Sequence, residues 1–166
     1  MNSPAPSSTE IRTSNNLGKH QEQAQTAKNL PRVLLVEDNE VHQRLMLFML
    51  EKLGVQVVLA QNGQQGFEAV LGGEPAGLIL MDLHMPRFDG YGATEKIREV
   101  ERKQGQTRRT IIAVTAYTHP EELQRCLAVG MDAVLLKPVS LEKLKAVLAP
   151  WLSKGSGDDT GRPGPP

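Results

Sequence analysis

The chain of 166 residues contains one cysteine and no excess of charge of either sign. The lone cysteine, Cys126, cannot form an internal disulfide, which favours a reducing compartment. Its neighbours are apolar (Leu123, Leu127 and Val129), so we expect a buried structural thiol and not a reactive one. Lysine plus arginine (19) balances aspartate plus glutamate (19). No net charge therefore draws the protein toward nucleic acid or anionic lipid, and we expect no nucleic-acid partner.

Long apolar segments are also lacking. No run approaches the roughly 20 apolar residues that a membrane-spanning helix needs. The first thirty residues lack the apolar core of a signal peptide. We therefore expect a cytoplasmic location without direct membrane contact, although a longer chain containing this one could still be anchored in a membrane.

The two ends of the chain differ in composition from its middle. Residues 1–30 are rich in Ser, Asn, Gln, Thr and Pro and contain no aromatic residue, so they bury too little apolar surface to offset their ordering entropy. The other end reads G-S-G-D-D-T-G-R-P-G-P-P from residue 155 onward. We predict a flexible leader or linker over 1–30, one folded domain over 31–153 and a flexible tail over 154–166.

Between these ends, short apolar runs alternate with helical patterns. Strands are predicted at Arg32–Glu37, Val55–Ala60, Gly77–Met81, Thr110–Thr115 and Ala133–Leu136. Helices are predicted at Glu40–Leu53, 63–71, 91–103, Pro120–Val129 and Leu141–Leu152. Continuous apolar strands that alternate with amphipathic helices indicate a parallel sheet covered on both faces. The fold class is therefore α/β, a doubly wound five-stranded parallel sheet.

Polar side chains gather where the predicted strands end. Glu37 and Asp38 follow the first strand, Asp82 the third, Thr115 ends the fourth and Lys137 follows the fifth. In this architecture, active groups lie outside the carboxyl ends of the strands. Three carboxylates in one crevice repel each other unless a cation neutralises them, and oxygen ligands of this kind suit Mg²⁺. With a lysine and a hydroxyl nearby, the set supplies the nucleophile, metal site and charge stabilisation that phosphoryl transfer needs.

Four segments, in their order and spacing, resemble the response regulator receiver family over Pro31 to about Ser153. They are V-E-D-N (36–39), M-D-L-H-M-P-R-F-D-G (81–90), V-T-A (114–116) and L-K-P (136–138). The resemblance implies a flavodoxin-like sheet with strand order 2-1-3-4-5 and helices on both faces. It also implies that Asp82 accepts the phosphoryl group.

The resemblance assigns further roles around Asp82. Asp38 and Asp82 would bind Mg²⁺ directly, the backbone carbonyl of His84 would be another ligand, and Glu37 would act largely through water. Thr115 and Lys137 would hold the phosphoryl oxygens. The peptide bond between Lys137 and Pro138 is usually cis in relatives.

The function implied by the resemblance is Mg²⁺-dependent phosphorylation of Asp82 by a phosphohistidine, in a two-component system or phosphorelay. The partners would be a histidine kinase, a histidine phosphotransfer domain, or both. The domain would catalyse its own phosphorylation and dephosphorylation without being a turnover enzyme by itself. The Thr-Ala after the fourth strand and the run G-M-D-A-V-L-L-K-P (130–138) are similar to receivers attached to hybrid sensor kinases.

Three alternatives stay open. One is a free-standing single-domain response regulator. Another is a pseudo-receiver that binds proteins without phosphorylation, which predicts the loss of an acid, the threonine or the lysine, and none is lost. The last is a phosphatase or dehalogenase with an aspartyl intermediate, which would need Asp-x-Asp at the first strand.

Two ring side chains stand close to the predicted site in the sequence. His84 lies two residues after Asp82, and Tyr117 lies two residues after Thr115. In relatives, these positions flank the path of the water that hydrolyses the phosphoaspartate. Our hypothesis is that the rings obstruct that water and slow self-dephosphorylation. The alternative is that both rings point to solvent.

The first predicted helix carries more apolar residues than one buried face needs. Its core stripe is predicted as Leu45, Met46, Met49, Leu50 and Leu53. Val41, Leu47 and Phe48 remain off that face and suggest a docking patch for a histidine-bearing helical partner. Broader burial of the same residues is the alternative.

Two other positions have plainer interpretations. Asp89 and Gly90 are explained by turn chemistry, and we assign them no catalytic role. Relatives with an aromatic switch carry Tyr or Phe three residues before the lysine, where this chain has Val134. A signal relayed by an aromatic rotamer at that position is therefore in doubt.

Overall fold

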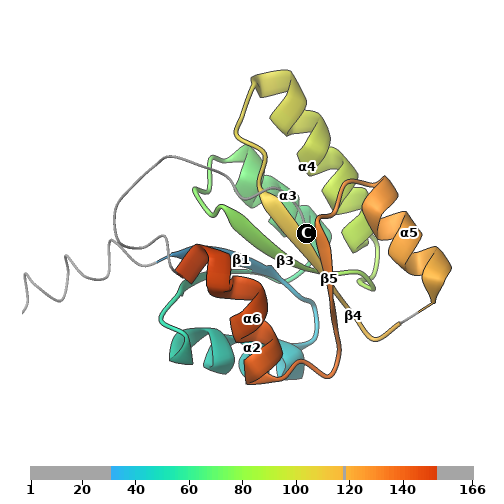
Figure 1. Cartoon of the computed structure of the whole chain (residues 1–166). Coiled ribbons are helices and arrows are strands. Elements are labelled where there is room, and N and C mark those ends of the chain that lie inside the picture. The colour runs from blue at the N-terminus through green and yellow to red at the C-terminus, as the bar shows by residue number, and fades with distance from the viewer. Residues whose placement is uncertain (1–30, 118, 153–166) are drawn as a thin grey trace, which may run out of the picture. The chain divides into compact units, whose positions relative to one another are not determined.

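A computed structural model describes residues 31–117 and 119–152, so the predicted leader (1–30) and tail (154–166) lie outside the described residues. Five parallel strands form one sheet in the order β2-β1-β3-β4-β5 (Figure 1). The strands are β1 (Arg32–Val36), β2 (Gln56–Ala60), β3 (Leu78–Asp82), β4 (Thr110–Thr115) and β5 (Ala133–Leu136). The predicted α/β class and strand order are confirmed.

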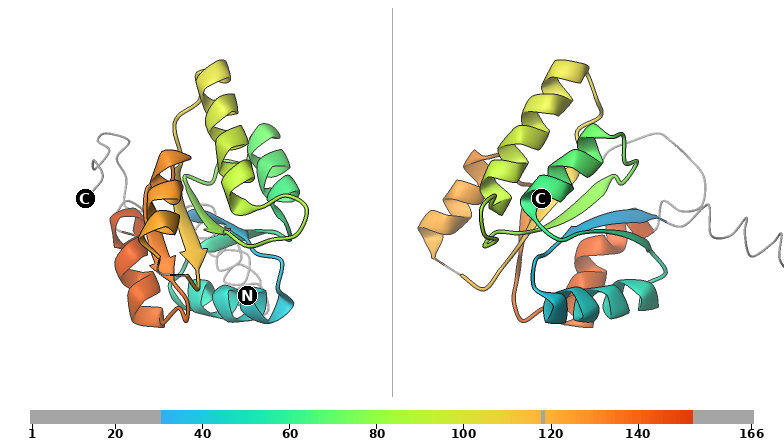
Figure 2. Two further views of the ribbon diagram at one scale, coloured as in Figure 1. Left: turned by 90° about the vertical axis from the view of Figure 1, so that its right-hand side faces the viewer. Right: turned by 180° about the vertical axis from the view of Figure 1, so that it is seen from behind.

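Five helices connect and cover the strands. They are α2 (Glu40–Lys52), α3 (Gly63–Leu71), α4 (Gly90–Gln104), α5 (Pro120–Ala128) and α6 (Leu141–Leu152). Helices α3, α4 and α5 cover one face of the sheet, and α2 and α6 cover the other (Figures 1 and 2). Within the described part of the chain, no helix is both long enough and apolar enough to cross a bilayer.

The starts of α2 and α4 are fixed by side chains that cap free backbone N–H groups. Asn39 caps α2 by accepting from the N–H of Val41 at 2.9 Å, and Asp89 caps α4 by accepting from that of Gly92 at 2.8 Å. Helix α4 ends at Gln104 and is capped by Gly105, whose φ of 60° lies in the left-handed region that glycine adopts readily. Asp89 is thus a cap, in line with the turn chemistry predicted for it.

The buried face of α2 differs from the prediction. Met46, Met49 and Leu50 are buried as predicted, but Leu45 is 50% exposed. Leu47, predicted to lie off the buried face, is partly buried and packs against the core. The reason is Gln43, which is buried and donates from Nε2 to the carbonyl oxygen of Glu37 at 2.8 Å.

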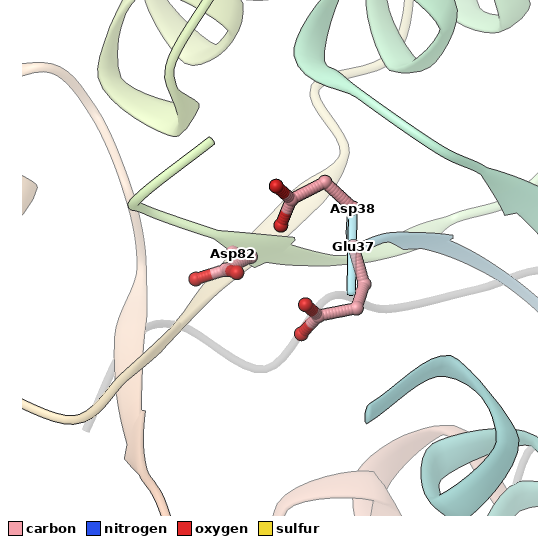
Figure 3. Close-up of side chains that lie close together, drawn as sticks. All are labelled: Glu37, Asp38 and Asp82. Carbon is pink, nitrogen blue, oxygen red and sulfur yellow. The ribbon is translucent and has the colours of Figure 1, made fainter. Parts of the chain in front are cut away.

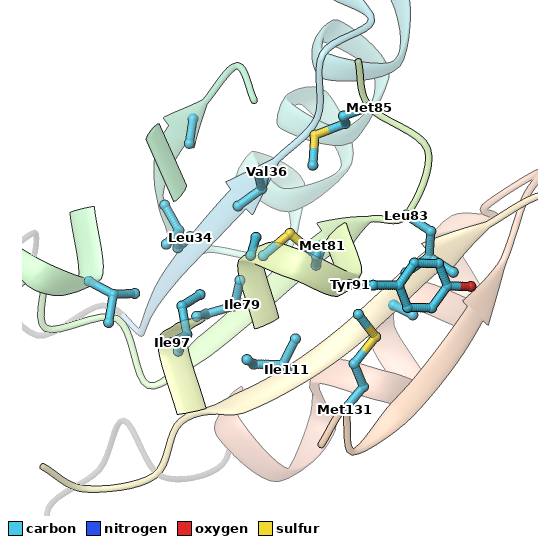
Figure 4. Packing of buried hydrophobic residues seen from close by; sticks show 14 of the residues in the cluster. Leu34, Val36, Ile79, Met81, Leu83, Met85, Tyr91, Ile97, Ile111 and Met131 are labelled. Carbon is cyan, nitrogen blue, oxygen red and sulfur yellow. The ribbon is translucent and has the colours of Figure 1, made fainter. Parts of the chain in front are cut away.

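The core on the α3–α4–α5 side contains Cys126 and Tyr91. Cys126 is fully buried, as predicted, and burial raises the pKa of its thiol. The ring of Tyr91 lies beside Leu83 and Met131, with its hydroxyl at the edge of the cluster (Figure 4). The thiol therefore belongs to the packing of this core.

Candidate functional site

The sheet register brings the predicted site residues to one edge. Val36 pairs with Met81, so Glu37 and Asp38 leave β1 beside the end of β3. Thr115 pairs with Leu136, so the lysine that follows leaves β5 beside the end of β4. Figure 3 shows Glu37, Asp38 and Asp82 together at the ends of β1 and β3.

The three acids form a compact cluster. Each offers a carboxylate oxygen, and these oxygens all lie within 4.8 Å of one another. Glu37 and Asp82 are buried, and Asp38 is more accessible. Burial raises the pKa of Asp82, and the charge of Glu37 raises it further, while Lys137 acts in the opposite direction. This donor set fits a hard divalent cation that keeps part of its water shell.

Lys137 supplies the positive charge at this cluster. Its Nζ lies 2.9 Å from Oε2 of Glu37 and 3.2 Å from Oδ2 of Asp82. The imidazole of His42 also faces it, with Nδ1 3.3 Å from the Nζ and 3.3 Å from Oε1 of Glu37. The ammonium therefore lies where it can contact a negatively charged group bound to Asp82.

A backbone hydrogen bond links Thr115 to Lys137, which starts the connection between β5 and α6. The carbonyl of Thr115 accepts from the N–H of Lys137 at 2.7 Å, and its buried hydroxyl accepts from the N–H of Tyr117 at 3.1 Å. The bond between Lys137 and Pro138 is cis, as the resemblance implied. The hydroxyl and the ammonium thus come from neighbouring strand ends.

The loop after Asp82 approaches its own strand closely. A Cβ on Gly90 would collide with the carbonyl oxygen of Asp82, so only glycine fits without displacement. The N–H of Gly90 donates to the carbonyl of Leu83 at 3.1 Å, and that of His84 donates to Oδ1 of Asp82 at 3.3 Å. Sequence reasoning assigned Gly90 to turn chemistry and missed this close approach.

The two predicted ring residues contact each other. The ring centroids of His84 and Tyr117 lie 4.6 Å apart, with an angle of 46° between the planes. His84 Nε2 lies 3.2 Å from Oε1 of Glu122, which also accepts from the hydroxyl of Tyr91 at 3.1 Å. Glu122 could not be identified from the sequence, because its partners are more than thirty positions away.

The exposed apolar residues of α2 form a different patch from the predicted one. Val41 (73% exposed), Leu45 (50%) and Phe48 (55%) follow each other at intervals of four and three residues, which places them on one stripe of the helix. The ammonium of Lys52 lies 4.4 Å from the centroid of the Phe48 ring. We call Val41, Leu45 and Phe48 the α2 stripe.

Comparison with known proteins agrees with this geometry. Residues 33–149 match the response regulator receiver domain. The chain belongs to that family, the receivers of two-component signalling.

Two curated relatives are sensor kinases. Sensor protein GacS of Pseudomonas syringae pv. syringae is 40% identical over 121 residues, which cover 73% of this chain. Sensor histidine kinase RcsC of Salmonella typhi is 38% identical over 122 residues, which cover 74%. The chain spans only 13% of the length of the first protein and 12% of the second.

Two solved structures are similar over nearly their whole length. The receiver domain of sensor histidine kinase PA1611 from Pseudomonas aeruginosa has a TM-score of 0.66 and 36% identity, covering 75% of this chain and 99% of that one. That structure has a magnesium ion coordinated in its active site cleft. The receiver of Saccharomyces cerevisiae Ssk1, solved with the histidine phosphotransfer protein Ypd1, has a TM-score of 0.71 and 31% identity, covering 78% and 94%.

Proposed function

We propose that this receiver domain accepts a phosphoryl group on Asp82 from a phosphohistidine, in a Mg²⁺-dependent reaction. The observation that carries the proposal is the contact of Lys137 Nζ with Asp82 at 3.2 Å, beside three carboxylates within 4.8 Å. In the reaction, a carboxylate oxygen of Asp82 attacks phosphorus and the P–N bond of the donor breaks. The leaving imidazole nitrogen keeps the electron pair of that bond.

The chain's own residues divide the remaining work. Asp38, Asp82 and the carbonyl of His84 would hold Mg²⁺, with Glu37 acting largely through water. When bound, the ion supplies positive charge that offsets the three carboxylates and the incoming phosphoryl oxygens. Lys137 exchanges its contact with Asp82 for a phosphoryl oxygen, and Thr115 donates its hydroxyl to another.

Incubation of the protein with acetyl phosphate and Mg²⁺ tests this function. The expected result, read by intact-protein mass spectrometry, is one phosphoryl group per chain in the wild type and none in Asp82→Asn. Asp89→Asn is the matched control, because asparagine caps α4 as well as aspartate does, and it should be phosphorylated normally. Steady phosphate release with no adduct would indicate a hydrolase, and absence of both would indicate a pseudo-receiver.

The wider setting proposed is a hybrid sensor kinase that relays to a histidine phosphotransfer domain. The similarity to GacS and RcsC supports it, as does the Ssk1 receiver's complex with Ypd1. A free-standing regulator is the alternative. The partner's histidine-bearing helices would dock on the α2 stripe, which replaces the predicted patch of Val41, Leu47 and Phe48.

The contact between His84 and Tyr117 supports slow self-dephosphorylation. Each ring is about half exposed and the two pack together two residues after Asp82 and Thr115, an arrangement expected of rings that restrict the approach of water. Replacing both rings (His84→Asn with Tyr117→Ala) should shorten the phosphoaspartate lifetime by about tenfold, since misplacing a reactant costs heavily in rate. His119→Asn is the control, because His119, like Tyr117, is a ring residue on the connection between β4 and α5. A lifetime no longer in the wild type than in the double variant would refute the hypothesis.

A further inference from the structure

One acid outside the phosphoryl site touches both the loop after Asp82 and helix α4. Glu122, in the first turn of α5, uses a single oxygen, Oε1, for both contacts: the Tyr91 hydroxyl at 3.1 Å and His84 Nε2 at 3.2 Å. Only 15% of the Glu122 side chain is exposed. Nothing in the roles assigned above uses this residue.

The Tyr91 side anchors Glu122 firmly. The Tyr91 ring is buried in the core (Figure 4). The guanidinium of Arg125 lies 3.9 Å from the centroid of this ring. Burial raises the pKa of Tyr91, so its hydroxyl keeps its proton and donates to the Glu122 carboxylate. A donor fixed in the core therefore holds the position of Oε1.

The His84 side is different, because half of that side chain is exposed. An imidazole in such a place has several rotamers open to it unless contacts select one. Two contacts do so here: Oε1 of Glu122 at one ring nitrogen and the Tyr117 ring at 4.6 Å. Removing the carboxylate would leave the contact with the Tyr117 ring without that of Glu122.

We propose that Glu122 is a positioning residue that holds the His84 ring beside the phosphorylated aspartate and so sets the lifetime of phospho-Asp82. The inference rests on the proposed phosphorylation of Asp82. Glu122 touches neither the phosphoryl group nor the attacking water. It acts by keeping the ring where water must pass, and the anchor of this arrangement is Tyr91 on α4.

The test compares four proteins labelled with acetyl phosphate and Mg²⁺ and then freed of the donor. Glu122→Ala should shorten the phosphoaspartate lifetime by about threefold to tenfold, the size expected for losing one ordinary hydrogen bond at a half-exposed side chain. Glu122→Gln keeps an accepting Oε1 and should stay within about twofold of the wild type. Glu121→Ala, the neighbouring exposed acid, should leave the lifetime unchanged.

Two further measurements separate positioning from a loss of structure. The rate of phosphorylation by acetyl phosphate should be the same in all four proteins, because Glu122 is not part of the acceptor site. Their thermal unfolding midpoints identify any variant that is merely unstable. If Glu122→Ala is unstable, Glu122→Gln remains informative.

An unchanged lifetime in Glu122→Ala would overturn the inference, as would equal shortening in the Ala and Gln variants. A wild type that never becomes phosphorylated would instead overturn the proposed function. The two failures are therefore distinguishable in the same experiment.

Discussion

Replacing Asp82 with asparagine should stabilise the protein when Mg²⁺ is absent. The Asp82 carboxylate is buried and faces those of Glu37 and Asp38 within 4.8 Å. At an effective dielectric constant of about 20, each such pair repels by about 3.5 kcal/mol. The ammonium of Lys137 at 3.2 Å attracts Asp82 by about 5 kcal/mol on the same scale. Repulsion therefore exceeds attraction by roughly 2 kcal/mol, the gain expected for Asp82→Asn at pH 7.

The same change should depend on pH in a defined direction. Burial and the charge of Glu37 raise the pKa of Asp82 above its ordinary value of 3.8, so the folded protein keeps this proton to a higher pH than the unfolded chain does. The wild type therefore loses stability relative to Asp82→Asn as the pH rises through that raised pKa. Below the ordinary pKa, Asp82 is protonated in both the folded and the unfolded wild type. The stability that Asp82→Asn gains by removing the charge then disappears.

Urea unfolding followed by circular dichroism, with and without Mg²⁺, measures these differences. Mg²⁺ at a hundredfold excess over its dissociation constant should stabilise the wild type by about 2.7 kcal/mol, and the asparagine variant by much less. Glu121→Gln, which removes an exposed acid, should stay within about 0.5 kcal/mol of the wild type. An Asp82→Asn protein less stable than the wild type at pH 7 without Mg²⁺ would refute the reasoning.

Two other predictions concern docking and the loop after Asp82. Leu45→Ala should slow phosphotransfer from a phosphorylated histidine partner by about tenfold, a docking-contact loss of about 1.4 kcal/mol, without changing the rate with acetyl phosphate. Leu71→Ala, an exposed leucine on α3, is its control, and equal transfer rates in the two variants would exclude the α2 stripe as the docking surface. Gly90→Ala should destabilise the fold by about 2 kcal/mol or more, because its Cβ would collide with the backbone of β3. Gly77→Ala, where a Cβ would meet no atom within 4 Å, should cost little in the same unfolding assay.

The sheet and the acidic cluster could be predicted because they depend on local patterns. Strands such as β3 (Leu78–Asp82), apolar up to the final aspartate, are buried from end to end, and parallel strands bring their carboxyl ends together whatever the details of packing. The side chains at those ends are therefore placed by topology alone. The roles of these side chains in phosphoryl transfer stay predictions.

The errors came from contacts that no periodicity reveals. The buried face of α2 was predicted from apolar residues alone, so the prediction included Leu45. The buried face instead includes Gln43, whose side chain donates a hydrogen bond to the carbonyl oxygen of Glu37. Arg98 on α4, for which no prediction was made, also donates to the carboxylates of Glu101 and Asp132 at 2.6 Å and 3.0 Å, and the second partner lies 34 positions away. Pairs of this kind are set by how helices pack on the sheet.

The hydrogen bond from Gln43 to Glu37 also has a geometrical consequence. It fastens the first turns of α2 to the end of β1, and Asn39 adds a second tie by donating its N–H to Oε1 of Glu37 at 3.1 Å. The α2 stripe, on which a partner would dock, is therefore tied through hydrogen bonds to Glu37, which lies beside the proposed acceptor Asp82. A partner bound to α2 would hold its histidine at a fixed distance from Asp82. A histidine placed one helical turn too far along the partner's helix in either direction would not reach the aspartate.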